Sequence, residues 1–352
     1  MRAAILRTLD ALQPVIPAWR GLPMSNPFSR WEFARAWLER PDVSPFVLVV
    51  TDDDGTLLAL APWSLRKKRG AIRQLEGIRG YDAWSHDPWI RDPALIAPIS
   101  DLLVETLRES RGDWDSLALI LSGERSARLI ERLEGFGWGF AERPGDRQGR
   151  IVDFTNGWDA YWNSRSAKFR ASIRQHQRKL DALPHRYVQA GPDDYQPLLE
   201  AAIGRSQGRW DPEHHRDHWY DGLRELAAAS APRGEFSAFG LEIDGRLAAI
   251  RIYYHAGDRA YEAIQVYDPD FGDYRVGNLM SAWCFERLCR NGTRILELGD
   301  GVMEWKERMM TGLGETVLVE VGATFSGKAL LGWKHVLKPQ LAGLWGQSAP
   351  SR

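Results

Sequence analysis

The sequence is poor in cysteine and has no long apolar run. Only Cys284 and Cys289 occur, five positions apart, which is neither a CxxC pair nor a disulfide framework and favours a reducing compartment. No stretch approaches the roughly 20 apolar residues that cross a bilayer. Residues 1–21 contain Asp10 and two prolines and lack the apolar core of a signal peptide. We therefore expect a cytoplasmic protein without stable membrane insertion.

An excess of either charge is also missing. The 352 residues include 46 Lys and Arg against 47 Asp and Glu, a formal net charge of −1. This balance argues against general coating of nucleic acid, although a local basic patch can still bind phosphate. The length predicts two domains, and the polar stretch ERPGDRQGR (142–150) is the expected boundary. We predict domains at 1–150 and 151–345.

The hydrophobic pattern before this boundary predicts an α/β unit. Helix signals and β-rich runs alternate, and an Asp54–Gly55 turn joins two of the β-rich runs into a hairpin. The expected helices are 26–41, 94–109 and 124–136, and the expected strands are 45–50, 56–65 and 114–121, with further β-like sequence through 72–90.

The second half follows a similar order at greater length. A long helix at 158–183 and one or two helices within 195–226 precede a three-stranded meander with tight turns at Asp244–Gly245 and Gly257–Asp258. The elements expected after the meander are a loop at 269–275, a helix at 276–292, a strand at 293–301, a short helix at 303–310 and a strand at 315–324.

Three segments resemble a known family. WDAYWNSRSAKFRASIRQHQRKL resembles the opening helix of BioF2-like, or CelD-like, acetyltransferase domains, and YDPDFGDYRVGNLM and RILELGDGVMEWKERM resemble their loop and strand-end motifs. The matches span 158–320, and 26–92 fits the N-terminal half of such proteins more loosely. The order of elements is also that of GNAT acyltransferases. The resemblance implies an α/β (α+β) fold of tandem GNAT-like domains, with mixed, mostly antiparallel sheets flanked by helices and a degenerate first domain.

The resemblance also implies a function. We expect an N-acetyltransferase that uses acetyl-CoA or another acyl-CoA as co-substrate and acylates an amine of a small, anionic or sugar-linked acceptor. The family's associations suggest polysaccharide or envelope metabolism. Two alternatives stay open. One is a Fem-type transferase that uses aminoacyl-tRNA, since Fem-type proteins share the two-domain layout. The other is a non-catalytic protein that binds an anion or a glycan.

The expected donor site follows from the resemblance. GNAT enzymes hold the CoA diphosphate on backbone N–H groups at a helix N-terminus, where the helix dipole favours an anion. Only Gly277 matches the family's three marker positions, because Tyr274 and Leu279 depart from the pattern. A split sheet that opens between Tyr267 and Leu296 would admit the thioester tail. The predicted donor-binding residues are Gln265, Tyr267, Tyr274, Arg275, Gly277 and Asn278.

Three residues are candidates for the chemistry. The acceptor amine must lose a proton as it attacks, and Glu262 or Asp300 could accept it directly or through water. Lys306 stands where the family has a lysine, and it could stabilise developing negative charge. It could equally be a solvated helix lysine. The residue before it is Trp305, where the family commonly has tyrosine, so either Tyr267 or Tyr274 protonates the leaving thiolate or no side chain does.

One face of the meander is expected to hold the acceptor. If Gly257–Asp258 is a two-residue turn, Tyr253 lies opposite Glu262 and Ile252 lies opposite Ala263. Arg251, Tyr253, His255 and Glu262 then share a polar face, whereas Ile250, Ile252, Tyr254, Tyr261 and Ala263 form a core face. We predict that Arg251 and Tyr253 bind the acceptor. The simpler alternative is a half-solvated sheet face with a modest ion pair.

The stretch 166–180 contains five Lys or Arg and no carboxylate. Phe169, Ile173, His176 and Leu180 form its expected buried stripe. Like charges spaced i, i+4 repel each other, so they do not stabilise the helix. A solvated face is the simpler explanation, but the family resemblance favours an anion site, for an anionic acceptor or for the donor. The predicted contacts are Lys168, Arg170, Arg174 and Arg178.

The segment EHHRDH (213–218) contains a candidate metal-binding pair. His214 and His218 are spaced i, i+4 and could bind a metal on a helix. No third ligand is placed by the sequence, so no metal site is predicted.

Overall fold

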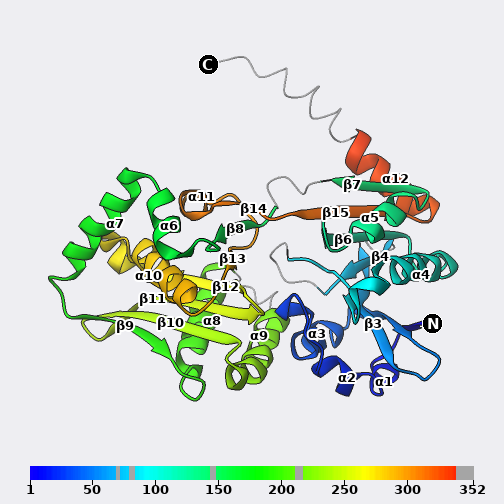
Figure 1. The fold of residues 1–352 in the computed structure, drawn as a ribbon, viewed down its shortest axis with the longest axis horizontal. Coiled ribbons are helices and arrows are strands. Elements are labelled where there is room, and N and C mark those ends of the chain that lie inside the picture. Colours follow the sequence, from blue (N-terminus) through cyan, green and yellow to red (C-terminus); the bar gives the residue numbers. More distant parts are fainter. Residues whose placement is uncertain (69–71, 79–83, 143–147, 211–216, 338–352) are drawn as a thin grey trace, which may run out of the picture.

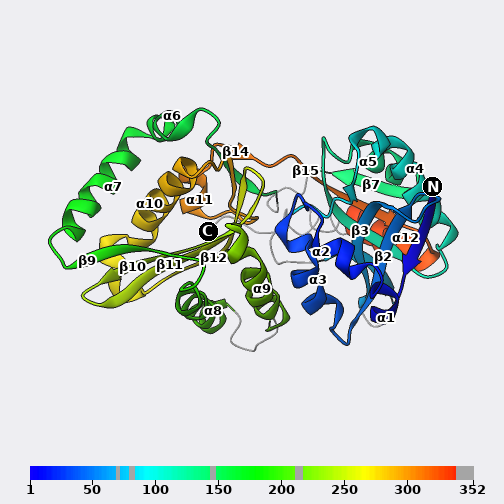
Figure 2. The ribbon, with the colours of Figure 1, turned by 60° about the horizontal axis from the view of Figure 1, so that its bottom comes forward.

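The computed structural model describes residues 1–68, 72–78, 84–142, 148–210 and 217–337. In this part of the chain two sheets, each flanked by helices, lie side by side along the long axis of the molecule (Figures 1 and 2). Both sheets are mixed and mostly antiparallel, which confirms the predicted fold class. Among the described residues, no helix combines the length and the apolar character that crossing a membrane requires.

The first sheet, sheet A, has the strand order β1-β2-β3-β4-β6-β15-β7, with β5 paired to β3. Its strands are β1 Arg2–Leu6, β2 Val43–Thr51, β3 Leu57–Lys68, β4 Ile72–Gly77, β5 Trp89–Ile90, β6 Ser116–Ser122, β7 Trp138–Glu142 and β15 Thr316–Gly322. Its helices are α1 Leu9–Leu12, α2 Ile16–Arg20, η1 Pro27–Ser29, α3 Trp31–Leu38, η2 Pro93–Leu95, α4 Ile96–Glu109, α5 Ala127–Glu134, α12 Phe325–Gly332 and η6 Trp333–Leu337.

The second sheet, sheet B, has the order β14-β8-β13-β12-β11-β10-β9. Its strands are β8 Arg150–Asp153, β9 His185–Ala190, β10 Phe236–Ile243, β11 Arg246–Ala256, β12 Arg259–Tyr267, β13 Ile295–Glu297 and β14 Gly312–Leu313. Its helices are α6 Gly157–Ser164, α7 Ala167–Leu180, α8 Gln196–Trp210, α9 Asp217–Ser230, η4 Ala231–Arg233, η5 Pro269–Tyr274, α10 Val276–Arg290 and α11 Glu304–Met309.

One strand of the second half joins the sheet of the first half. β8 begins the second half and pairs with β13 of sheet B, whereas β15 comes from the end of the second half and lies between β6 and β7 of sheet A. In Figure 1 the orange strand β15 runs from sheet B across to sheet A. The division at residues 150 and 151 stays a prediction, and residues 143–147 of its linker lie outside the described residues. Sheet A therefore contains one strand from the second half, whereas the strands of sheet B all lie between residues 150 and 313.

An aromatic core joins the halves. The Phe28 ring stacks on Trp84 with centroids 3.9 Å apart, and Trp219 of α9 stacks on Trp84 at 5.8 Å. The Tyr254 ring of β11 meets the edge of Phe28 at 5.7 Å. Aromatic rings bury large apolar areas and favour such geometry. This core covers the face of sheet B that carries Ile250, Ile252, Tyr254 and Tyr261, which confirms the predicted core face.

Two local predictions are wrong. The expected long helix at 158–183 is two helices, because Arg165 and Ser166 adopt extended backbone and the Ser166 hydroxyl caps α7 by accepting a hydrogen bond from the Phe169 N–H. In the meander, Tyr253 lies opposite Glu262 as predicted, but Ile252 pairs with Ile264 instead of Ala263. A β-bulge at Ala263 causes this shift and reorients the rest of β12.

Candidate functional site

In sheet B the neighbouring strands β12 and β13 separate after a short paired region. β12 and β13 run parallel and pair over three positions only, the last being Tyr261 with Glu297. β12 then continues to Tyr267, while the chain after β13 turns away toward α11. The predicted split in the sheet is therefore confirmed.

A cavity of about 530 Å³ lies where the strands separate. β12, the start of α10 and the loop after β13 form its walls. It contains most of the residues predicted to bind the donor: Gln265, Tyr267, Arg275, Gly277 and Asn278. Tyr274 does not line it; its ring instead receives the Lys179 ammonium of α7 at 4.8 Å. The sequence motif and the fold thus bring five of these six residues to one cavity.

The N-terminus of α10 opens into this cavity. Arg275 is the residue before the helix and has φ of 53°, a left-handed conformation that is costly without glycine. This conformation turns the chain from η5 into α10. The first N–H groups of a helix lack intrahelical partners and attract anions. Arg275 adds positive charge to the wall, whereas Arg308 is ion-paired with Glu304, the acidic residue of the lining.

The opposite wall is the loop that leads into α11. Lys306 is buried, and its ammonium donates a hydrogen bond to the Asp300 carbonyl oxygen at 2.5 Å. The Trp305 ring lines the cavity, and its indole Nε1 donates to no described residue. Lys306 therefore closes the loop across residues 300–306. Whether Asp300 or Lys306 takes part in chemistry stays a prediction, since neither side chain lines the cavity.

The predicted polar face of the meander is buried beneath α10. Arg251 forms a buried ion pair with Glu262, and the Tyr253 hydroxyl donates to Glu262 Oε1 at 3.1 Å. The Arg251 guanidinium also reaches Ser281 Oγ and the Gly277 carbonyl oxygen of α10. Burial disfavours the charged guanidinium, but the Glu262 carboxylate outweighs it and raises the Arg251 pKa; burial also raises the Tyr253 pKa. The three residues lie together, and none of them lines the cavity at the start of α10.

The basic helix divides into two groups. Arg170 donates to the Asn163 and Arg165 carbonyl oxygens and so ties α6 to α7. Lys168, Arg174 and Arg178 are exposed, and no described residue forms an ion pair with them. In the expected buried stripe Phe169 and Leu180 are buried, whereas Ile173 and His176 are half-buried. The anion site on α7 remains a prediction.

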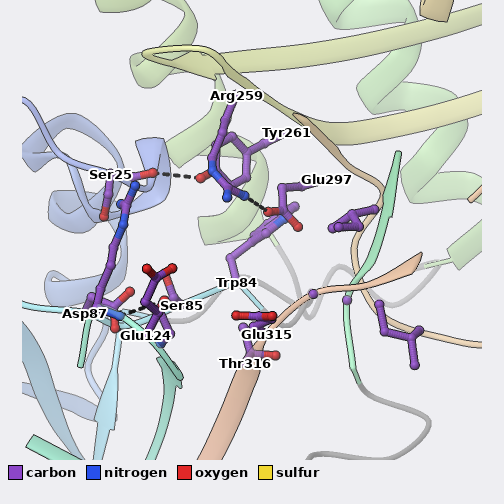
Figure 3. A pocket seen from close by; sticks show the side chains of 16 residues that line it. Ser25, Trp84, Ser85, Asp87, Glu124, Arg259, Tyr261, Glu297, Glu315 and Thr316 are labelled. Atoms are coloured by element: carbon purple, nitrogen blue, oxygen red, sulfur yellow. Dashed lines mark hydrogen bonds and ion pairs between the residues drawn. The ribbon is translucent and has the colours of Figure 1, made fainter. Parts of the chain in front are cut away.

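Sequence reasoning missed a second cavity, of about 300 Å³, between the halves. Figure 3 shows Arg259, Tyr261 and Glu297 of sheet B on one side, and Asp87 and Glu124 on the other. Arg259 donates to Glu297 at 2.6 Å. Burial raises the pKa of Glu297, although Arg259 opposes this effect. No local motif marks these residues, because the cavity forms only when the halves meet.

The described residues contain no group of three or more potential His, Cys, Asp or Glu metal ligands. His214 of the candidate pair lies outside them, and His218 contacts the Arg40 guanidinium.

These features fit a known domain. The family model for the acetyltransferase (GNAT) domain matches residues 167–307, from the start of α7 into α11. Residues 167–307 are thus similar to the acetyltransferase (GNAT) domain. The match includes the whole opening between β12 and β13 and the start of α10. No match was found among curated proteins.

Solved structures share the two-part architecture well beyond the GNAT domain. FemX is 11% identical with a TM-score of 0.59, and the alignment covers 91% of this chain and 97% of that one. A conserved Bacteroides thetaiotaomicron protein of unknown function is 13% identical with a TM-score of 0.56, covering 91% and 99%. The C-terminal domain of a putative lysylphosphatidylglycerol synthetase from Agrobacterium fabrum is 12% identical with a TM-score of 0.52, covering 85% and 89%. At such identities the likeness concerns the fold alone.

Proposed function

We propose that the protein is an N-acyltransferase that moves an acyl group, acetyl in the first instance, from acyl-CoA to the amine of a small acceptor. The observation that carries this proposal is the cavity between β12 and the loop after β13, at the N-terminus of α10. A GNAT domain is the setting in which such an opening receives a thioester. A sugar-linked acceptor would fit polysaccharide or envelope metabolism, as the resemblance implies.

The cavity offers what the donor requires. The α10 N-terminus and Arg275 supply positive charge for a diphosphate, while the charge of Arg308 is already paired with Glu304. The Trp305 indole N–H, which no described residue accepts, can donate to a carbonyl or phosphate oxygen of the donor. Gln265 and Tyr267 lie on the unpaired part of β12, where a polar tail can hydrogen-bond to the strand edge.

The reaction needs no further co-reactant. The amine nitrogen attacks the thioester carbonyl carbon, the C–N bond forms and the C–S bond breaks. The acceptor ammonium loses two protons in total: one goes to solvent, directly or through a carboxylate, and the other goes to the departing thiolate. A backbone N–H of β12 near the Ala263 bulge is suited to stabilise the oxyanion, because the bulge frees it from regular pairing.

Donor binding and turnover are separate tests. A ligand at 100 times its dissociation constant stabilises a protein by about 2.7 kcal/mol, which raises the melting temperature of a chain of this size by roughly 5 °C. We expect this shift with acetyl-CoA and amine-dependent release of free CoA thiol. No shift at 1 mM acetyl-CoA contradicts the proposal. A shift without CoA release, over a broad amine panel, supports a non-catalytic binding protein instead.

One observation favours a second candidate, a Fem-type transferase that uses aminoacyl-tRNA. Lys168, Arg174 and Arg178 are exposed on α7 without described partners, and FemX shares the fold. A nucleic-acid backbone would bind such basic residues with a strong dependence on salt. Retention of tRNA that falls steeply between 50 and 200 mM salt and is lost on Arg174→Ala/Arg178→Ala would favour it. The control is Arg186→Ala/Arg233→Ala, at exposed arginines paired with Glu242 and Glu235.

A further inference from the structure

We call the cavity of about 530 Å³ at the start of α10 the donor cavity. The cavity between the halves lies on the opposite face of sheet B from it. Tyr261 and Glu297, the last paired residues of β12 and β13, line it. Gln265 and Tyr267, beyond the bulge, face α10 and line the donor cavity. The two cavities therefore lie on opposite faces of β12.

Three polar atoms on or beside the wall of this cavity lack protein partners. Asp87 is 7% exposed and Trp84 is 4% exposed. Among the described residues, none bonds to Asp87 Oδ2, Trp84 Nε1 or Thr316 Oγ1. All three residues line the cavity (Figure 3). Buried polar groups are nearly always hydrogen-bonded, since each unmade bond costs about 1–3 kcal/mol. A ligand that both donates and accepts hydrogen bonds would satisfy them.

Asp87 is held in place by its other oxygen. Oδ1 accepts hydrogen bonds from the Ser122 N–H at 2.8 Å and from the Ser126 hydroxyl at 2.6 Å. These contacts leave Oδ2 as the atom available to a ligand. Trp84 is equally constrained, because its ring stacks on Phe28 at 3.9 Å and contacts Trp219 at 5.8 Å. Rigid side chains with unsatisfied atoms are suited to recognise a small polar molecule.

The charge of the lining favours a cation. Four carboxylates line the cavity against two guanidinium groups, and one of those is already paired with Glu297. The acidic residues are Asp87, Glu124, Glu297 and Glu315, and the basic ones are Arg125 and Arg259. Burial raises the pKa of both Asp87 and Glu297, so a nearby ammonium would relieve an unfavourable environment.

We propose that this cavity binds the acceptor as a small hydroxylated primary amine, of the chemical class of amino sugars and amino alcohols. The amine lies at Glu297, next to the end of the β12–β13 pairing. The hydroxyl groups donate to Asp87 Oδ2 and accept from the Trp84 indole and the Thr316 hydroxyl. The cavity volume, about 300 Å³, is at the small end for ligand sites. This assignment rests on the proposed acyl transfer, for which it names the class of acceptor.

The test measures binding of D-glucosamine by calorimetry without a donor, so that it does not depend on turnover. D-Glucose lacks the amine and 1-aminobutane lacks the hydroxyls. We expect D-glucosamine to bind at least tenfold more tightly than either. No heat of binding with D-glucosamine up to 20 mM overturns the assignment, as does equal binding of 1-aminobutane.

Two variants locate the site. Thr316→Val removes a hydroxyl without a protein partner from a strand, where valine is well tolerated. Stability should stay the same or rise, while D-glucosamine affinity falls about fivefold to tenfold. Asp87→Asn keeps an Oδ1 acceptor for Ser122 and Ser126 and should weaken binding by a similar factor. Unchanged affinity in both variants overturns the assignment.

The matched control is Ser116→Ala. Ser116 Oγ is also buried without a partner among the described residues, and it lies on β6 of the same sheet, but Ser116 does not line the cavity. Ser116→Ala should leave D-glucosamine affinity unchanged. Acetyl-CoA should raise the melting temperature of all three variants as it does that of the wild type. A failure of donor binding in the wild type therefore counts against acyl transfer, whereas a failure of the amine measurements counts against the cavity.

Discussion

The two halves share one strand plan but differ at the centre. In each sheet four antiparallel strands lead to a short parallel pair, β4 with β6 and β12 with β13, and two further antiparallel strands complete the sheet. In sheet B the parallel strands separate around the donor cavity. In sheet A the chain fills the corresponding gap with residues 84–87. One plan therefore yields an open split in one half and a closed one in the other.

Hydrogen bonds hold the filling segment against β6. The His86 N–H donates to the Ile120 carbonyl at 2.6 Å, and the Ile120 N–H donates to His86 Nδ1 at 3.0 Å. The Trp63 indole donates to the His86 carbonyl at 3.1 Å. Gly77 ends β4 here, and its missing side chain makes room for the His86 ring. The split of the first half is thus filled, while Trp84 and Asp87 of the same segment line the cavity that faces sheet B.

The largest expected effect is on stability, through the buried polar cluster of Arg251, Tyr253 and Glu262 in sheet B. Glu262→Gln removes the partner of the buried Arg251 guanidinium, and breaking a buried pair in this way costs about 3–5 kcal/mol. Chemical denaturation should show this loss in the free energy of unfolding. Glu242→Gln is the control, since its pair with the exposed Arg186 contributes less than about 1 kcal/mol. Full stability together with lost turnover would instead support Glu262 as a catalytic base.

The next prediction closes the open split. A Cβ on Gly277 would meet only the Tyr267 ring, at 3.5 Å, so Gly277→Leu should fold and place its side chain in the donor cavity. We expect acetyl-CoA affinity to fall at least a hundredfold, about 2.7 kcal/mol, without loss of stability, because leucine favours helix.

Gly204→Leu is the matched control for this change. It introduces leucine at an exposed position of α8 where a Cβ meets nothing within 4 Å, and it should leave the acetyl-CoA response intact. If Gly277→Leu binds acetyl-CoA as the wild type does, the donor does not enter this cavity.

The closed split can be strained in the same way. A Cβ on Gly77 would lie 2.1 Å from His86 Cγ, so Gly77→Ala must displace the filling segment. Such overpacking costs about 1–3 kcal/mol. The double variant Gly77→Ala/His86→Gly should be about as stable as His86→Gly alone, because glycine removes the Cβ, Cγ and Cδ2 atoms of His86 that the added methyl group would meet. Strictly additive losses in the two single variants and the double would show that His86 does not fill the gap.

The smallest expected effect is a loss of stability at low pH that comes from His255. Burial lowers the His255 pKa to about 4 from 6.5, so the unfolded chain binds a proton at a pH where the folded chain does not. Stability from this residue is complete above pH 6.5 and is lost as pH falls toward 4. Between pH 7 and pH 5 we expect a loss of about 1–2 kcal/mol.

His255→Gln should flatten this part of the profile while keeping a partner for the Ser237 hydroxyl. The pH range avoids Glu235, whose pKa Arg30 and Arg233 hold at about 2 against its burial. Its stability contribution is lost only as pH falls below about 4.5. An identical slope in His255→Gln would contradict a buried neutral His255.

Local sequence signals predicted elements where they act over a few residues. The turns Asp244–Gly245 and Gly257–Asp258 have positive φ at Asp244 and at both glycines, as tight hairpin turns require, and they set the meander. Patterning alone missed the bulge at Ala263, since a single extra residue leaves the alternation of apolar residues almost unchanged. It also missed the break before α7, because Ser166 caps a helix without interrupting its apolar stripe.

Sequence alone therefore determined the core face of the meander, the helix that follows the donor loop and the residues gathered at its start. These depend on turn chemistry and on side-chain periodicity, which are properties of neighbouring residues. Tertiary structure decided the insertion of β15 into sheet A, the closure of the first split by His86 and the placing of Asp87 and Glu297 around one cavity. Asp87 and Glu297 are far apart in the chain, and only the packing of one half against the other brings them to the same cavity.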